Sequence, residues 1–223
     1  MKKHYHIIFI ASLIVYVISC QSLQNENKSS VGTLGIKESA DTSLTKKEFG
    51  DRFSIIGDFN GDKIIDTLSE SYISSLTNSE TYKTLDNQDW ENNIDLVIKN
   101  KPITRLFANI PNVDTFVVTK EFQQAGLFHY RNLGDINNDG QDEIGYAIKW
   151  VDNSNLNSYH ILGLKDNKFI ELFNFSINEA LLYGDQEGTF DNGDLIKREG
   201  ERTILYKFYS DTATLETGKH EFN

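Results

Sequence analysis

Two short segments rich in aspartate and asparagine carry the clearest chemistry in this sequence. Loop 1 covers residues 58–66 (DFNGDKIID), and loop 2, which starts 77 residues later, covers residues 135–143 (DINNDGQDE). Both have oxygen-bearing side chains at loop positions 1, 3, 5 and 9, and both follow an apolar residue and a glycine. Hard cations such as calcium take about six to eight oxygen ligands from carboxylates, carbonyls and water. The spacing therefore predicts two calcium-binding loops.

Short β-type segments must position these loops. Runs of β-branched and aromatic residues alternate with turn clusters rich in Asn, Asp and Gly, and only two prolines are present. The sequence therefore predicts an all-β domain, with at most one helical turn in each of Ser69–Leu76 and Ser176–Leu182. The predicted strands are Ile94–Ile98, Thr115–Thr119, Ile144–Val151, Ser158–Leu164, Phe169–Phe175, Asp194–Lys197 and Thr203–Tyr209.

The repeated pattern resembles the calcium loops of FG-GAP repeats, which are integrin-like and also called VCBS-type. In that family the loop joins two strands of a β-propeller blade, and the ion stiffens the turn. The resemblance implies a small β-propeller-like domain of four or five blades, with an open β-assembly as the alternative, because a seven-bladed propeller at roughly 40–60 residues per blade is too long for this chain. Carried over by position, it implies the side-chain ligands Asp58, Asn60, Asp62 and Asp66 with the Ile64 carbonyl in loop 1, and Asp135, Asn137, Asp139 and Glu143 with the Gln141 carbonyl in loop 2.

Two positions depart from the family pattern. Position 6, where glycine eases the turn, is Gly140 in loop 2 but Lys63 in loop 1. A positive φ at a non-glycine residue costs of order 1 kcal/mol, so loop 1 is expected to turn differently or to bind more weakly. Position 9 of loop 2 is Glu143, which can ligate in bidentate fashion, with Asp142 as an alternative. An EF-hand does not fit, because neither loop has a glutamate at position 12.

The N-terminus indicates export. Lys2 and Lys3 precede the apolar run Ile7–Ile18, which is too short to span a bilayer as a helix, and Cys20 follows it. This arrangement resembles a bacterial lipobox. It predicts a signal peptide at residues 1–19 and a lipidated Cys20 that anchors the protein in the cell envelope, facing the periplasm or the cell surface. Gln21 follows the cysteine, which favours the outer membrane where a cell has two.

Composition bounds the remainder of the chain. Residues 20–50 are polar and predict a flexible tether, and residues 51–223 predict one folded domain. Cys20 is the only cysteine, so the mature domain has no intrachain disulfide and no cysteine nucleophile. Removing residues 1–19 removes two lysines and no acids, so Lys+Arg falls from 22 to 20 against 33 Asp+Glu, and the formal net charge goes from −11 to −13. Such a charge argues against a nucleic-acid partner.

Signatures of catalysis are absent from the sequence. It contains no Gly-x-Ser-x-Gly elbow, no phosphate-binding loop and no His-Glu-x-x-His motif. The three histidines of the mature part, His129, His160 and His220, are far apart in sequence and are expected to be strand or surface residues.

These features predict a non-catalytic, calcium-binding envelope lipoprotein that binds a protein or a glycan. One alternative is an inhibitor or immunity protein against a lysozyme-type cell-wall hydrolase, because an acidic surface would attract a basic enzyme. A second alternative is a carbohydrate-active hydrolase, because a chain this acidic offers many pairs of carboxylates.

Overall fold

The computed structural model describes residues 49–50, 52–83, 90–152, 154–179, 182, 195–210 and 214–223. The predicted signal peptide at residues 1–19, the predicted lipidation site Cys20 and nearly all of the predicted tether at 20–50 lie outside these ranges. Within the described ranges, no helix is both long enough and apolar enough to cross a membrane.

The described part of the chain is mostly β, which confirms the all-β prediction at this level. Its eleven strands are β1 (Ser54–Gly57), β2 (Asp66–Ser74), β3 (Pro102–Ala108), β4 (Phe116–Thr119), β5 (Gln124–Gly134), β6 (Glu143–Trp150), β7 (Leu156–Lys165), β8 (Lys168–Asn178), β9 (Ile196–Arg198), β10 (Thr203–Tyr209) and β11 (Leu215–Glu221). Its one helix is α2 (Trp90–Asn100), which connects β2 to β3 along the chain.

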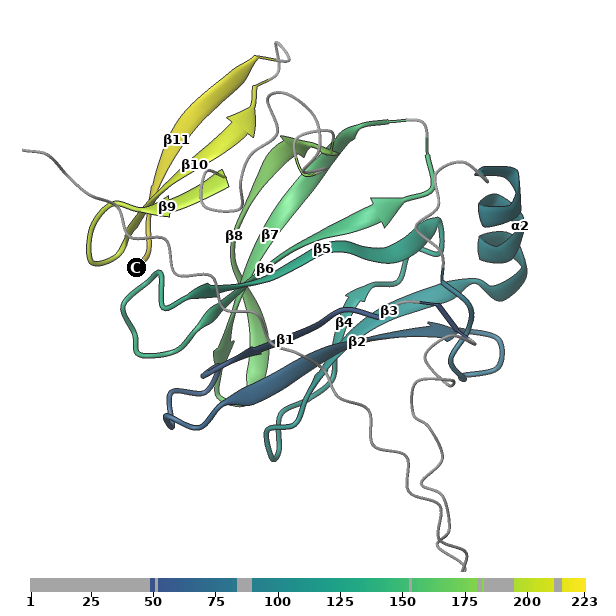
Figure 1. Ribbon diagram of the computed structural model, residues 1–223, viewed down its shortest axis with the longest axis horizontal. Helices are drawn as coiled ribbons and strands as arrows, with labels where there is room; N and C mark the ends of the chain where they lie inside the picture. Colours follow the sequence, from purple (N-terminus) through teal and green to yellow (C-terminus); the bar gives the residue numbers. More distant parts are fainter. Residues whose placement is uncertain are drawn as a thin grey trace, which may run out of the picture. The chain divides into compact units, whose positions relative to one another are not determined.

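The strands form three antiparallel sheets in which sequential strands are neighbours. Sheet A has the order β1-β2-β3-β4, sheet B has the order β5-β6-β7-β8, and sheet C has the order β11-β10-β9. The sheets therefore follow one another along the chain, and in Figure 1 sheet A runs from blue to teal, sheet B from teal to green, and sheet C is yellow. In the part of the chain that the structure describes, none of them closes into a barrel or a propeller.

Sheet B is packed on both faces. Ile144 and Leu162 lie in a core cluster that also contains Leu68 and Leu106 of sheet A. Ala147 and Ile161 point to the other face and share a second cluster with Ile204 of β10. Since successive residues of a strand face opposite sides of a sheet, β6 needs apolar residues at both parities, and Glu143–Ile148 is buried throughout.

Two local predictions are wrong. Ile94–Ile98 was expected to be a strand but lies within α2, whose buried positions Asn93 and Val97 are four residues apart, as on one face of a helix. Ser69–Leu76 was expected to hold a helical turn, but its first six residues belong to β2. In β2 the alternation of buried and half-buried residues has the period of two that a strand requires.

Candidate metal centre

Loops 1 and 2 occupy the same place in two different sheets. Loop 1 connects β1 to β2, the first two strands of sheet A, and loop 2 connects β5 to β6, the first two strands of sheet B. The register also matches, because Gly57 pairs with Asp66 and Gly134 pairs with Glu143. In both cases the glycine before the loop faces the acid at position 9. Figure 1 shows the two loops at the same edge of the sheets, on the left.

An apolar residue at position 2 anchors each loop in a core. Phe59 of loop 1 is completely buried in the cluster that contains residues of sheets A and B. Ile136 of loop 2 is buried in the cluster that contains residues of sheets B and C. The buried residue at position 2 thereby fixes where the loop backbone lies, and with it the polar residues at positions 1 and 3.

The same five internal hydrogen bonds form in each loop, between equivalent positions. In each loop the position 1 carboxylate accepts from the position 6 N–H, the position 3 amide oxygen from the position 5 N–H, and the position 5 carboxylate from the position 7 N–H. The position 3 amide also donates to the position 5 carboxylate, and the position 2 N–H donates to the position 9 acid. In this order the distances are 2.9, 3.0, 2.8, 3.0 and 3.3 Å in loop 1 and 3.1, 2.9, 3.0, 3.0 and 2.8 Å in loop 2.

The backbone turns in the same way in both loops. Position 4 has a positive φ in each, at 76° for Gly61 and 62° for Asn138. Position 6 also has a positive φ in each, at 67° for Lys63 and 89° for Gly140. The expectation that loop 1 turns differently is therefore wrong. Each loop has one glycine and one non-glycine residue at these two left-handed positions. Loop 1 bears the larger conformational cost, because asparagine adopts this region more readily than lysine.

Position 9 holds a buried acid in both loops. Asp66 is 6% exposed and Glu143 is 1% exposed. Burial raises the pKa of Glu143 to about 8, and the charges of Asp139 and Asp135 add to the increase. Burial also raises the pKa of Asp66, and the charges of Asp62 and Asp58 act in the same direction. A divalent cation in either loop would oppose these causes, because it favours the ionised carboxylate.

Glu143, rather than Asp142, occupies the place equivalent to Asp66. Its carboxylate accepts from the N–H groups of Ile136 (2.8 Å) and Asn137 (3.3 Å). The Asp142 side chain points instead to loop 1, as described below. Of the two alternatives for position 9, the geometry therefore favours Glu143.

One carboxylate oxygen in loop 1 is not satisfied by the protein's own hydrogen-bond donors. Oδ1 of Asp58 is buried and has no hydrogen-bond partner. A buried charged oxygen without a partner is costly, and a bound cation would satisfy it. The equivalent Oδ1 of Asp135 accepts from the Asp139 N–H at 3.0 Å. The buried oxygen without a partner thus belongs to loop 1, which the sequence favoured less.

The donors present suit calcium better than a softer metal. Each loop offers carboxylates, one amide oxygen at position 3 and one main-chain carbonyl at position 7, all of which are hard oxygen ligands. Across the described ranges, no group of three or more His, Cys, Asp and Glu side chains is drawn together so as to hold a metal ion. An ion in either loop would therefore also need the amide and main-chain oxygens.

Several side-chain contacts that support the loops were not predicted from the sequence. Arg198 of β9 donates to the Asp135 carbonyl (3.0 Å) and to Oδ1 of Asn138 (2.9 Å), so sheet C holds loop 2 in place. Gln141, oriented with its amide nitrogen towards loop 1, donates to the carbonyls of Phe59 (3.0 Å) and Leu164 (2.9 Å). These contacts join segments far apart in sequence, and no local motif indicates them.

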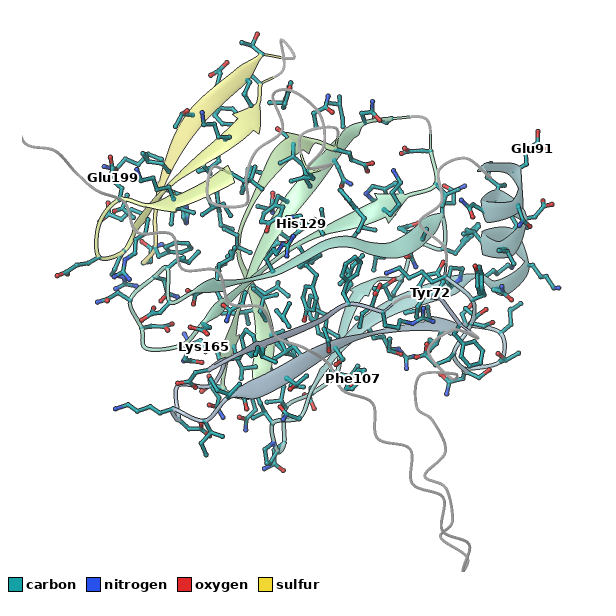
Figure 2. The ribbon with its side chains drawn as sticks, in the orientation of Figure 1. Tyr72, Glu91, Phe107, His129, Lys165 and Glu199 are labelled. Carbon is teal, nitrogen blue, oxygen red and sulfur yellow. The ribbon has the colours of Figure 1, made fainter. Side chains whose placement is uncertain are left out.

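The three histidines lie in strands. His129 is in β5, and Figure 2 shows it in the middle of the structure among the side chains of sheet B. Nδ1 of His160 lies 2.6 Å from Oε2 of Glu171, and the His160 ring stacks on Tyr146. His220 stacks on Phe173 with a centroid distance of 3.9 Å, and partial burial lowers its pKa.

A hollow of about 630 Å³ adjoins both loops. It is lined by Asn60 of loop 1, by residues of loop 2, by the turn between β7 and β8, and by the last residues of the chain. Lys165 and Arg202 stand on its wall together with the acidic Asp139 and Glu171. In Figure 2, Lys165 lies at the end of sheet B that carries loop 2. The lining is therefore of mixed charge.

Comparisons with known proteins do not assign this chain to a family. No protein-family description matches this sequence, and no curated protein is significantly similar to it.

Proposed function

We propose that loops 1 and 2 each bind a calcium ion that stiffens the connection between the first two strands of sheets A and B. The observation that carries this proposal is the position-by-position match of the two loops in donors, hydrogen bonds and backbone turns, together with the unpartnered Oδ1 of Asp58. When bound, the ion would neutralise the clustered carboxylates and hold the loop closed. The residues that would hold it are Asp58, Asn60, Asp62, Ile64 and Asp66 in loop 1, and Asp135, Asn137, Asp139, Gln141 and Glu143 in loop 2.

A melting curve of the full chain in detergent tests this proposal. Calcium that binds only the folded state stabilises it by about 2.7 kcal/mol at a hundred-fold excess over Kd. We expect calcium to raise the melting temperature, chelator to reverse the rise, and Asp135→Ala to reduce it. Glu216→Ala removes the same charge from an exposed position of β11 and should leave the calcium response intact. A chain that melts at the same temperature in calcium and in chelator would refute calcium binding.

The fold within which the ions act is proposed to be propeller-like. Two four-stranded meanders with the loop between their first and second strands, packed face to face, are the arrangement expected of two adjacent blades. Sheet C would be a shortened third blade, packed on the other face of sheet B. We propose an open assembly of blades, because no ring closes within the described ranges.

The protein is proposed to be a lipoprotein of the cell envelope, anchored through a lipid on Cys20 and located in the outer membrane where there are two membranes. The lipobox-like N-terminus supports this location. Cys20→Ser tests it: the variant should no longer incorporate labelled fatty acid and should no longer sediment with membranes. Unchanged labelling would remove the anchor from the proposal.

For its function on the envelope, we propose that the domain binds a protein or a glycan without catalysis. The mixed lining of the hollow beside the loops suits a polar partner. The alternative, inhibition of a cell-wall hydrolase, is favoured by the net charge of −13 on the mature chain, because that charge would steer a basic enzyme to it. Salt-sensitive binding to a lysozyme-type hydrolase would select the inhibitor, and binding to immobilised glycans would select the glycan-binding protein.

A further inference from the structure

We propose that the two loops bind calcium cooperatively. Asp142, at position 8 of loop 2, is hydrogen-bonded to the backbone of Asp58, whose carboxylate is the first ligand of loop 1. This inference rests on the proposed calcium binding and adds the relation between the two sites.

Both main-chain polar groups of Asp58 are bound by Asp142. The Asp142 N–H donates to the Asp58 carbonyl at 2.8 Å, and Oδ2 of Asp142 accepts from the Asp58 N–H at 3.1 Å. Asp58 offers the position 1 carboxylate of loop 1, and Asp142 lies between the position 7 and position 9 ligands of loop 2. One residue of sheet B therefore fixes the backbone from which the first ligand of loop 1 projects.

Asn132 of β5 reinforces this contact. Its amide nitrogen donates to Oδ2 of Asp142 (2.7 Å) and to the carbonyl of Ile56 (2.9 Å). A Cβ at Gly57 would lie 2.3 Å from that nitrogen and 2.6 Å from Oδ2 of Asp142. The strand that leads into loop 1 thus approaches sheet B so closely that only glycine fits between them.

The loops also touch directly. A Cβ at Gly61 of loop 1 would lie 3.1 Å from the Gly140 carbonyl and 3.1 Å from Cγ of Gln141. The Gln141 amide reaches the Phe59 carbonyl as well. Loop 1 is therefore in contact with positions 6, 7 and 8 of loop 2, which comprise the proposed ligand at position 7 and the two residues beside it.

The sign of the coupling follows from this arrangement. An ion in loop 2 would fix the Gln141 carbonyl and Glu143, and thereby Asp142 between them. Because Asp142 then holds Asp58, loop 1 loses less conformational freedom when its own ion binds, which is positive cooperativity. Repulsion between the two cations acts in the opposite direction, but the negative Asp142 carboxylate lies between the loops and offsets it. Linkage requires that loop 1 strengthens loop 2 by the same factor.

Calorimetric titration of the full chain with calcium alone tests the coupling. Asp139→Ala empties loop 2 and should weaken binding at loop 1, and Asp62→Ala should weaken loop 2 by the same factor; we expect roughly five-fold or more. In an Asp142→Ala background, Asp139→Ala should no longer weaken binding at loop 1. Amide exchange across residues 58–66 should report the same coupling, because emptying loop 2 should speed exchange in loop 1 only while Asp142 is present.

The controls separate the possible failures. Glu216→Ala removes a charge away from both loops and should leave cooperativity unchanged. If Asp142→Ala does not fold, Asn132→Ala serves instead, because it removes the reinforcing contact and should lower the coupling in part. Absence of any calcium binding would overturn the proposed function itself. Two ions that bind independently or anticooperatively, or cooperativity that survives Asp142→Ala, would overturn the coupling and leave the calcium sites standing.

Discussion

The ammonium group of Lys83 lies 2.7 and 2.6 Å from the two carboxylate oxygens of Glu70, and both side chains are almost completely buried. Lys83 also donates to the Leu127 carbonyl (2.7 Å), and Glu70 accepts from the N–H groups of Leu127 (2.8 Å) and Phe53 (3.2 Å). The pair therefore joins β2 of sheet A to β5 of sheet B. Its charges are satisfied by each other and by the backbone, which a buried pair requires.

Replacing Lys83 by methionine should destabilise the protein strongly. Lys83→Met leaves the Glu70 carboxylate buried without its cation, and losing one member of such a pair costs roughly 3–5 kcal/mol. Adding Glu70→Gln should restore part of the loss, because the amide oxygen still accepts from the backbone. Urea denaturation measures both effects. Lys219→Met breaks the exposed pair with Glu199 and should change nothing measurable; an equal effect of the two methionine variants would contradict the assignment.

Position 6 of loop 1 should be improvable. Lys63 has φ at 67°, so Lys63→Gly should stabilise the protein by about 1 kcal/mol. Gly140→Ala should do the reverse in loop 2, and its cost is purely conformational because nothing lies within 4 Å of the added Cβ. Thermal melting in chelator measures both variants without a contribution from calcium. Gly200→Ala, at a glycine with ordinary φ and room for a methyl group, is the control, and loss of stability in Lys63→Gly would show that the lysine side chain matters more than its backbone.

Removing the arginine over loop 2 should loosen that loop. Arg198→Ala deletes the hydrogen bonds to the Asp135 carbonyl and to Asn138, each of which contributes roughly 0.5–1.5 kcal/mol. Amide exchange of residues 135–143 should become faster, while exchange in the core strand β6 remains slow. Lys197→Ala, one residue earlier in β9 and exposed, is the matched control. Unchanged exchange in loop 2 would mean that β5 and β6 alone hold it.

The packing of helix α2 should depend on the side chain of Val97 and not on that of Ile98. Val97 is 4% exposed and Ile98 is 57% exposed. Val97→Ala removes two buried methyl groups and should cost roughly 2 kcal/mol, whereas the larger truncation Ile98→Ala should be close to neutral. Chemical denaturation of the two variants side by side decides this. A larger loss of stability in Ile98→Ala than in Val97→Ala would show that the face of α2 carrying Ile98 packs against the protein, which would contradict this structure.

The parts of the fold that follow from local sequence were predictable. Thr203–Tyr209 is rich in β-branched and aromatic residues, and its predicted boundaries are those of β10. The positions of the oxygen-bearing residues in loops 1 and 2 were also visible, and the structure places the two sets in equivalent settings. In both cases, residues adjacent in sequence determine the structure.

Where distant residues decide, the sequence misleads. β2 was not among the predicted strands, and the burial of Glu70 within it depends on Lys83, which no local pattern pairs with it. Ile94–Ile98 taken alone has the composition of a strand, and the shared burial of Asn93 and Val97, four residues apart on one face of α2, is seen only in the structure. Asp142 and Arg198 support the loops across sheets, so their roles appear only when the sheets are assembled.

The contact between Asp58 and Asp142 joins residues 84 positions apart in the chain. That contact cannot form until residue 142 has been synthesised. Loop 1 is synthesised first, so the Asp58 backbone acquires these hydrogen-bond partners only when the segment before β6 lies beside it. Closing so long a loop costs conformational entropy, and until it is closed β1, an edge strand of sheet A, lacks its contacts with sheet B and is open to pairing with other chains.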